Sequence, residues 1–296
     1  MIVGIGELLW DMYPDGRKVA GGAPFNFAFH CHQLGHEAVI VSRVGDDALG
    51  RELREEVKRL GLSDEYIQKD REHPTGTVTV SLDENKVPTY SITENVAWDG
   101  IAFEPRLALL AEFSVAMCFG TLAQRNLTSR ETIQRFLTST QHQCRIFDLN
   151  FRQPSIDNEM LITGMKRSNW IKMNEYEAQE ISTSLKLVST QFIPWQLGRA
   201  LALPRTHPTL WMITRGEAGC ELFQTPDLDS VIPAVPARVV DTVGAGDAFT
   251  AAMVCLHLEG RPLRDCARFA NHYAARVCEH QGATPRIDRA EVERAL

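Results

Sequence analysis

The chain has 296 residues, of which 44% are hydrophobic and 23% are charged. These proportions are ordinary for a globular protein and exclude a fibrous or intrinsically disordered chain. Because the formal net charge is −7, the molecule as a whole repels nucleic-acid phosphates and anionic lipid. Nucleic acid is therefore not an expected partner, and an anionic ligand needs a local binding device.

The cysteines and the N-terminus indicate the compartment. Seven cysteines, an odd number without a CxxC pair, predict reduced thiols and argue against a disulfide framework or a zinc ribbon. The first residues include Glu7 and Asp11 where a signal peptide needs apolar residues. Apolar stretches stay far below the ~18 residues of a membrane span. We expect a cytoplasmic protein with no membrane partner.

Short apolar runs alternate with helical patterns along most of the chain. We expect six runs to be buried strands, because they are too short and too evenly apolar for helices. These runs are residues 2–5, 38–44, 115–119, 145–149, 170–173 and 210–214. Between them, apolar positions recur at helical spacing, as in residues 46–61. The alternation predicts an α/β fold with a mostly parallel sheet flanked by helices.

One segment breaks this alternation. In residues 75–92, Val78, Val80 and Leu82 alternate with polar residues. This pattern predicts half-covered antiparallel strands joined by a turn near Asn85. We interpret the segment as a small β appendage, to which the Pro-, Asp- and Gly-rich residues 11–18 would add.

Polar or glycine residues follow almost every predicted strand. They include Gly6-Glu7, Gly45-Asp46, Gly120-Thr121, residues 148–152, residues 174–177 and residues 214–216. Open α/β sheets bind ligands outside the carboxyl ends of their strands. The pattern therefore predicts a polar site along one edge of the sheet.

The strongest local signal is the segment from Asp241 to Phe249, which opens an apolar helical run. The small residues Gly244, Ala245 and Gly246 let the backbone approach a ligand, and a helix N-terminus favours an anion such as phosphate. Asp247 would be repelled by that phosphate unless it has a task, such as accepting a proton from an attacking hydroxyl. Alternatively, Asp247 is only a favourable first-turn carboxylate beside a chain-reversing turn.

Other phosphate and hydrolase motifs are missing from the sequence. There is no Gly-Lys dipeptide for a Walker A loop, no HRD or DFG of a protein kinase, and no HExxH or GxSxG. Phe249 stands where a Rossmann fingerprint needs its third glycine. These absences disfavour hydrolase and hydride-transfer functions.

A second glycine-rich segment precedes a predicted helix near the N-terminus. Gly21 and Gly22 allow backbone contact with a ligand, and the Asn26 side chain offers a donor and an acceptor to hydroxyls. Taken alone, the same pattern also fits an ordinary helix N-terminus.

The two segments, GGAPFNFAFHCHQLG and DTVGAGDAF, resemble the two signature regions of the ribokinase-like (PfkB) family of sugar kinases. The resemblance extends through VGDDALG at 44–50, TRGEAG at 214–219, and Asn271. DLNFR at 148–152 and FGTLAQR at 119–125 are most similar to fructokinases, with Thr121 replacing the usual Ser. The resemblance implies a ribokinase-like fold and an enzyme that transfers phosphate from ATP to a primary hydroxyl of a small sugar, fructose being favoured.

The resemblance also implies roles for individual residues. Asp247 matches the catalytic base, and the backbone of Gly244, Ala245 and Gly246 matches the anion hole. Asp11, Gly21, Gly22, Asn26 and Arg152 match positions that contact the sugar, whereas Thr214, Gly216 and Asn271 match nucleotide-site positions. Asn174 and Glu177 match a motif linked to Mg²⁺ through water, and Asp241 lies near a monovalent-cation site, for K⁺, that some members possess. Arg152 fits a surface salt bridge equally well, and Asn174 with Glu177 fits a helix cap.

The β appendage matches the family lid, which covers the sugar and in many members contributes to a homodimer. We expect residues 1–9, 21–73 and 101–296 to form the core, and residues 10–20 and 74–100 to form the lid. Alternative acceptors are 2-keto-3-deoxygluconate, ribose and a nucleoside. A sugar- or nucleotide-binding sensor on an inactive kinase scaffold is the alternative from another class, although the intact Asp247 argues against it.

Overall fold

The structure is a computed structural model. It describes residues 1–82, 88–140, 144–152, 157–187, 193–200, 210–224 and 227–296. The turn expected near Asn85 lies outside these residues.

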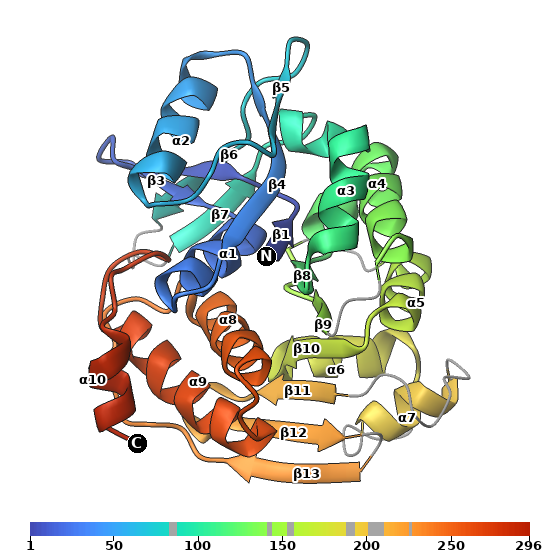
Figure 1. Ribbon diagram of the computed structural model, residues 1–296, viewed down its shortest axis with the longest axis vertical. Helices are drawn as coiled ribbons and strands as arrows, with labels where there is room; N and C mark the ends of the chain where they lie inside the picture. Colours follow the sequence, from blue (N-terminus) through green and yellow to red (C-terminus); the bar gives the residue numbers. More distant parts are fainter. Residues whose placement is uncertain (83–87, 141–143, 153–156, 188–192, 201–209, 225–226) are drawn as a thin grey trace.

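A nine-stranded sheet runs through the molecule in the order β13-β12-β11-β10-β9-β8-β1-β4-β5 (Figure 1). The strands are β1 Ile2–Ile5, β4 Ala38–Gly45, β5 Ile67–Asp70, β8 Ala116–Phe119, β9 Cys144–Asp148, β10 Trp170–Asn174, β11 Leu210–Thr214, β12 Cys220–Gln224 and β13 Asp227–Ile232. All neighbours from β5 to β11 pair in parallel, whereas β12 and β13 are antiparallel. The predicted α/β fold with a mostly parallel sheet is confirmed.

The six predicted strands are confirmed, with bounds that differ by at most one residue at either end. The sequence analysis missed three strands, β5, β12 and β13, which lie at the two sides of the sheet. Strands at a sheet margin have fewer buried positions, so their sequences carry polar residues and do not read as apolar runs. In β5, for example, Lys69 is exposed although its neighbours Gln68 and Asp70 are buried.

Helices cover both faces of the large sheet, as an α/β sandwich requires. Their bounds are α1 Ala23–Gln33, α2 Ala48–Arg59, α3 Pro105–Phe113, α4 Leu127–Thr138, α5 Asn158–Arg167, α6 Glu175–Ser184, α7 Ile193–Ala200, α8 Ala245–Leu258, α9 Leu263–Cys278 and α10 Arg289–Arg294. Helices α1, α2, α8, α9 and α10 share one hydrophobic core, and α3 to α7 share the other. No helix in the described part of the chain is long and apolar enough to cross a bilayer.

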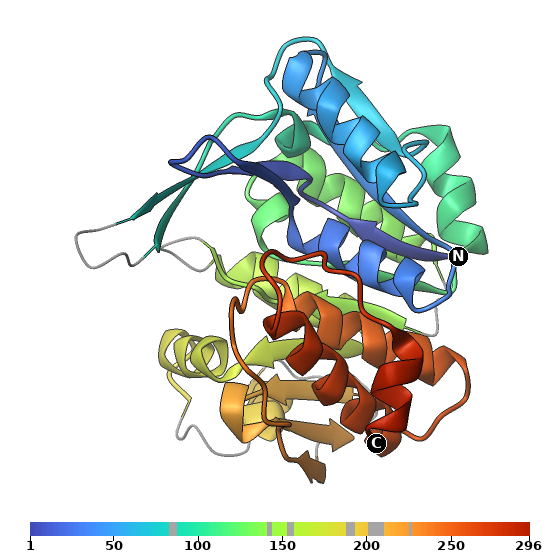
Figure 2. The ribbon, with the colours of Figure 1, turned by 90° about the vertical axis from the view of Figure 1, so that its left-hand side faces the viewer.

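A separate four-stranded sheet has the order β3-β2-β6-β7. Its strands are β2 Leu9–Met12, β3 Lys18–Gly21, β6 Thr77–Leu82 and β7 Pro88–Ile92. The antiparallel pairing of β6 with β7 is as predicted, and Val78 and Val80 are buried between exposed residues. Figure 2 shows this sheet extending away from the main body of the molecule.

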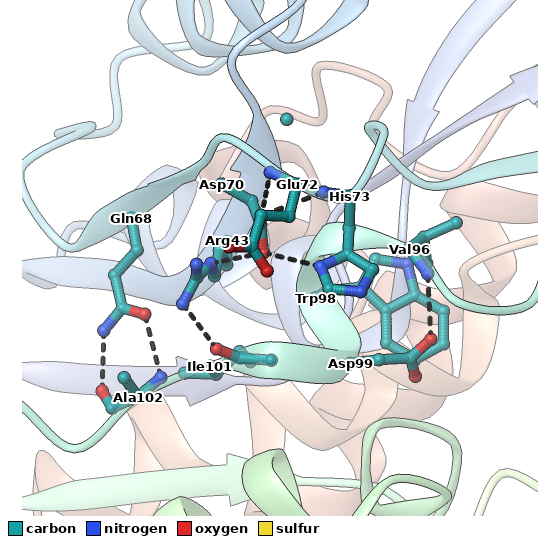
Figure 3. Close-up of polar contacts among 12 residues, drawn as sticks. Arg43, Gln68, Asp70, Glu72, His73, Val96, Trp98, Asp99, Ile101 and Ala102 are labelled. Carbon is teal, nitrogen blue, oxygen red and sulfur yellow. Dashed lines mark hydrogen bonds and ion pairs between the residues drawn. The ribbon is translucent and has the colours of Figure 1, made fainter.

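Polar contacts fix the chain where it enters and leaves the second sheet (Figure 3). The Arg43 guanidinium pairs with the buried Asp70 carboxylate at 2.8 Å and donates to the Gly100 carbonyl at 2.8 Å. Gln68 exchanges two hydrogen bonds with the backbone of Ala102. These contacts join the segment before the second sheet to the segment after it, and so hold the two connections together at its base.

The C-terminal segment packs against the end of α1. The Gln33 amide donates to the Tyr273 hydroxyl at 2.8 Å and accepts the Ile287 N–H at 2.9 Å. The Arg289 guanidinium donates to the Leu34 carbonyl at 2.8 Å. The C-terminal residues therefore hold α1 in place against α8 and α9.

Asp47 should contribute strongly to stability, because it joins α2 to the base of the second sheet. Its carboxylate accepts the N–H of Gly50 in the first turn of α2. It also accepts the Thr75 N–H and hydroxyl, and all three hydrogen bonds are 2.7 to 2.8 Å long. Asp47→Ala removes the helix cap and leaves buried donors without an acceptor, so we expect a loss of about 2 to 3 kcal/mol in the unfolding free energy measured in urea.

The neighbouring Asp46 provides the control for this measurement. It is exposed, so Asp46→Ala should change the unfolding free energy by less than about 0.5 kcal/mol. Equal losses in the two variants would contradict the structural role of Asp47.

Candidate active site

The strand order reverses beside β1, which places a ligand crevice at its carboxyl end. The chain passes from β1 to β4 on one side, whereas β8 lies on the other side. Open α/β sheets bind ligands at such a reversal. Glu7 follows β1 here, Thr121 follows β8, and residues 148–152 follow β9.

The turn before α8 has the geometry of an anion-binding helix N-terminus. Gly244 has φ of 80°, and a Cβ there would lie only 2.6 Å from the Ala283 Cα. Only glycine satisfies both conditions without strain. Ala245 and Gly246 begin the helix, whose first-turn N–H groups lack intrahelical partners and form the positive end of its dipole. The Ala245 N–H donates to the Thr242 carbonyl at 3.3 Å.

Asp247 lies in the first turn of α8 and is buried. The Asn26 amide of α1 donates to Asp247 Oδ2 at 2.8 Å. Burial raises the pKa of Asp247 to about 7, and the nearby Asp148 adds to this, whereas Asn26, Lys172 and Arg152 lower it. A carboxyl group with a pKa near neutrality suits proton transfer at physiological pH. The structure thus brings together Asn26 and Asp247, which are 221 positions apart.

Two charged residues of neighbouring strands lie buried below this turn. Lys172 Nζ donates to Asp148 Oδ1 at 3.0 Å, and the Thr250 hydroxyl of α8 donates to Asp148 Oδ2 at 2.9 Å. A Cβ at Gly246 would lie 2.8 Å from Lys172 Nζ. No role was predicted from the sequence for Lys172 or Thr250, and Asp148 was predicted only as a polar strand end and as part of DLNFR. A lysine inside an apolar run was the available signal.

Glu7 is another residue to which the sequence analysis gave no role beyond a polar strand end. Its Oε1 accepts the Ala23 N–H of α1 at 3.2 Å, and its buried Oε2 has no partner among the described residues. Burial raises the pKa of Glu7 to about 7, and the Asp247 charge also raises it. Glu7 thus adds a second buried carboxyl group to the site.

Two of the predicted sugar positions, Asp11 and Arg152, interact electrostatically. Burial raises the pKa of Asp11 to about 6, while the Arg152 charge lowers it. Arg152 also lowers the pKa values of Glu7 and Asp247, which places its guanidinium within electrostatic reach of three carboxyl groups.

Gly21 and Gly22 pack directly against two of these acidic residues. A Cβ at Gly21 would lie 2.7 Å from Asp11 Oδ2, and one at Gly22 would lie 2.3 Å from the Glu7 carbonyl oxygen. Side chains at these positions would push the backbone away from Asp11 and Glu7.

The predicted nucleotide positions lie further along the sheet. Thr214 ends β11, and Gly216 begins the short 3₁₀ turn Gly216–Ala218 with φ of 51°. The Asn271 amide of α9 donates to the carbonyls of Ile232 and Pro233 at the end of β13. Strands β8, β9 and β10 separate these positions from Glu7.

The predicted metal positions make local contacts. Asn174 and Glu177 form a capping box at the start of α6, and Glu177 also accepts the Phe151 N–H at 2.9 Å. Asp241 accepts the N–H groups of Val243 and Gly282 at 3.0 and 2.9 Å. The described residues contain no cluster of three or more His, Cys, Asp or Glu side chains arranged for direct metal ligation.

Comparison with known proteins places the chain in a family of phosphotransferases. Residues 13–289 match the pfkB family of carbohydrate kinases. The chain belongs to this family. It is a kinase that transfers phosphate to a sugar, and the family binds ATP.

Three relatives illustrate the range of the similarity. The uncharacterized sugar kinase PH1459 of Pyrococcus horikoshii is 27% identical, with a TM-score of 0.82 over 99% of this chain and 96% of its own. A fructokinase of Klebsiella pneumoniae is 29% identical over 84% of this chain and 82% of its own length. A ribokinase of Bacillus subtilis is 28% identical over 95% and 88% respectively.

The raised pKa values of Glu7 and Asp247 predict a pH dependence of stability. Between about pH 4.5 and 7 the native state binds protons that the unfolded state releases, so each group makes stability fall as pH rises. Glu7→Gln and Asp247→Asn remove this contribution. The unfolding free energy of each variant minus that of the parent should therefore increase by on the order of 2 kcal/mol as the pH rises from 5 to 8.

Urea unfolding of the parent and both variants at four pH values measures this difference directly. A variant-minus-parent difference that stays constant across the range would contradict the burial of these carboxyl groups as protonated species.

Proposed function

We propose that this kinase uses ATP to phosphorylate a primary hydroxyl of a small sugar, with fructose as the preferred acceptor. The observation that carries the proposal is the buried Asp247, placed beside the Gly244–Gly246 turn and held by Asn26. Phosphoryl transfer needs an acceptor oxygen, a proton acceptor and a positive environment for the phosphate oxygens. This part of the site offers the second and third of these.

In the proposed reaction, Asp247 accepts the proton of the sugar hydroxyl. The hydroxyl oxygen forms a bond to the γ-phosphorus, and the bond from that phosphorus to the bridging oxygen of ADP breaks. The first-turn N–H groups at Gly244, Ala245 and Gly246 would stabilise the transferred phosphoryl group. ADP leaves with the electron pair of the broken bond.

The sugar would lie among Asp11, Gly21, Gly22, Asn26 and Arg152. Asn26 Oδ1 and Glu7 Oε2 are buried acceptors that lack partners among the described residues. Unsatisfied buried acceptors are costly unless a ligand supplies donors, and a polyol supplies several. The projecting sheet of β2, β3, β6 and β7 would act as a lid over the sugar and as a homodimer contact.

The nucleotide would extend toward Thr214, Gly216 and Asn271. Asn174 and Glu177 would hold Mg²⁺ through water, which fits side chains already engaged in a capping box, because Mg²⁺ keeps much of its hydration shell. The ion would neutralise charge on the phosphates of ATP. If this chain shares the monovalent-cation site of some family members, K⁺ would bind near Asp241.

Fructose specificity rests on DLNFR, FGTLAQR and the fructokinase relatives. We expect fructose to give the highest kcat/KM in a panel with ribose, glucose, 2-keto-3-deoxygluconate and adenosine, measured by ADP release. A tenfold preference for ribose or adenosine would replace the fructose assignment and leave the kinase assignment in place. ATP binding without turnover of any acceptor would favour the sensor alternative.

The role of Asp247 has its own test. Asp247→Asn keeps the shape of the side chain but removes proton acceptance, which should lower kcat by about 10² to 10⁴ with ATP and sugar affinities close to those of the parent. Steady-state kinetics and a thermal melt of the same preparation measure both effects. A variant that folds normally and keeps at least a third of the parent kcat would exclude Asp247 as the base.

A further inference from the structure

The Lys172–Asp148 ion pair occupies a place where apolar side chains are expected. The two residues pair in register on adjacent parallel strands. Their exposed fractions are 5% and 4%. Two residues earlier on the same strand faces, Trp170 and Ile146 belong to the hydrophobic core shared with α8. The ion pair therefore continues this core to the carboxyl ends of β9 and β10, below the first turn of α8.

Stability alone is a weak reason for this pair. Desolvation of two buried charges offsets most of their attraction, and well-packed apolar residues of similar volume often stabilise a fold as well or better. The pair is also held in one arrangement. Lys172 and Thr250 donate to different oxygens of Asp148, and the absence of a side chain at Gly246 leaves room for the ammonium group.

We propose that Lys172 and Asp148 are positioning residues that set the ionisation of Asp247, with Lys172 favouring the proton-accepting carboxylate and Asp148 limiting that effect. The inference rests on the proposed role of Asp247 as the base. Lys172 approaches the backbone of Gly246, the residue next to Asp247, and Asp148 is tied to Thr250 on the following turn of the same helix. Both charges are therefore held at fixed positions between the sheet and the first turns of α8, close to Asp247.

Asp247 is surrounded by groups of both charge signs. The acids are Glu7 after β1 and Asp148 on β9, and the cations are Arg152 after β9 and Lys172 on β10. The Cys118 thiol of β8 is nearby and neutral, because burial raises its pKa well above the usual range. The neutral Asn26 faces it from α1. An arriving ATP phosphate adds further negative charge and disfavours ionisation of Asp247. Lys172 is the buried cation among these groups, since Arg152 is exposed, so it is screened least by solvent.

Two substitutions should move the pKa of Asp247 in opposite directions. Lys172→Met keeps the length of the side chain and removes its positive charge, so the pKa should rise by about one unit or more. Asp148→Asn keeps the shape and removes a negative charge, so the pKa should fall by a similar amount. If the pair served stability alone, the two substitutions would remove the same contact, and the pKa of Asp247 would not move in opposite directions.

The measurement has two parts. The acid limb of kcat/KM for the sugar, recorded from pH 5 to 9 at saturating ATP, should shift upward in Lys172→Met and downward in Asp148→Asn. A ¹³C NMR titration of the Asp247 carboxyl, assigned with Asp247→Asn, should show the same two shifts without ATP or sugar. The NMR titration reports on the ion pair even if the kinase reaction assigned above is wrong.

Thr250→Val is the matched control. It removes the hydroxyl bond to Asp148 but keeps both charges, so it should lower the melting temperature and leave the pKa of Asp247 within about 0.3 units of the parent value. Shifts in the same direction for Lys172→Met and Asp148→Asn, or none in either, would overturn the proposal. If Lys172→Met does not fold, the downward shift in the isosteric Asp148→Asn still decides it. Full activity of Asp247→Asn would refute the proposed base but not the opposed NMR shifts.

Discussion

The proposed base must be both buried and able to ionise, and the proposed site depends on this constraint. Burial alone favours the protonated form of Asp247, which cannot accept a proton, up to neutral pH. The fold offsets this with the helix dipole of α8, the Asn26 amide and two nearby cations. These groups come from α1, β10 and the segment after β9, so the sheet order that brings these elements together is also what makes the carboxylate usable.

The same constraint explains where glycine is needed. At Gly246 a side chain would meet the Lys172 ammonium, and at Gly22 it would meet the backbone of Glu7. In both places a charged residue lies directly under a backbone segment that is expected to face a ligand. The close approach of the backbone strengthens these electrostatic interactions, because a displacement of even one or two ångströms would weaken the interaction of each buried charge with its neighbours.

The sequence predicted the parallel strands and the α8 turn because both depend on local pattern. Strands such as Ile2–Ile5 are buried on both faces and appear as apolar runs, and the Gly244 turn combines small residues with the start of an apolar helix. Strands β12 and β13 were missed because they lie at one side of the sheet. The pairing of Lys172 with Asp148 was missed because it follows from strand register, a tertiary property that neither segment reveals alone.

The contacts between α1 and residues more than 200 positions later bear on how the protein is made. Asn26 emerges early in synthesis, but Asp247 and the residues that hold α1, such as Ile287 and Arg289, emerge much later. Until α8 and α9 are synthesised, strand β1 and helix α1 therefore expose apolar side chains that belong to the core shared with these helices. Such long-range contacts slow folding and leave surface exposed to aggregation. The nascent chain should thus depend on chaperones until α8 and α9 are complete, and removal of the residues that follow α9 should impair folding as a whole.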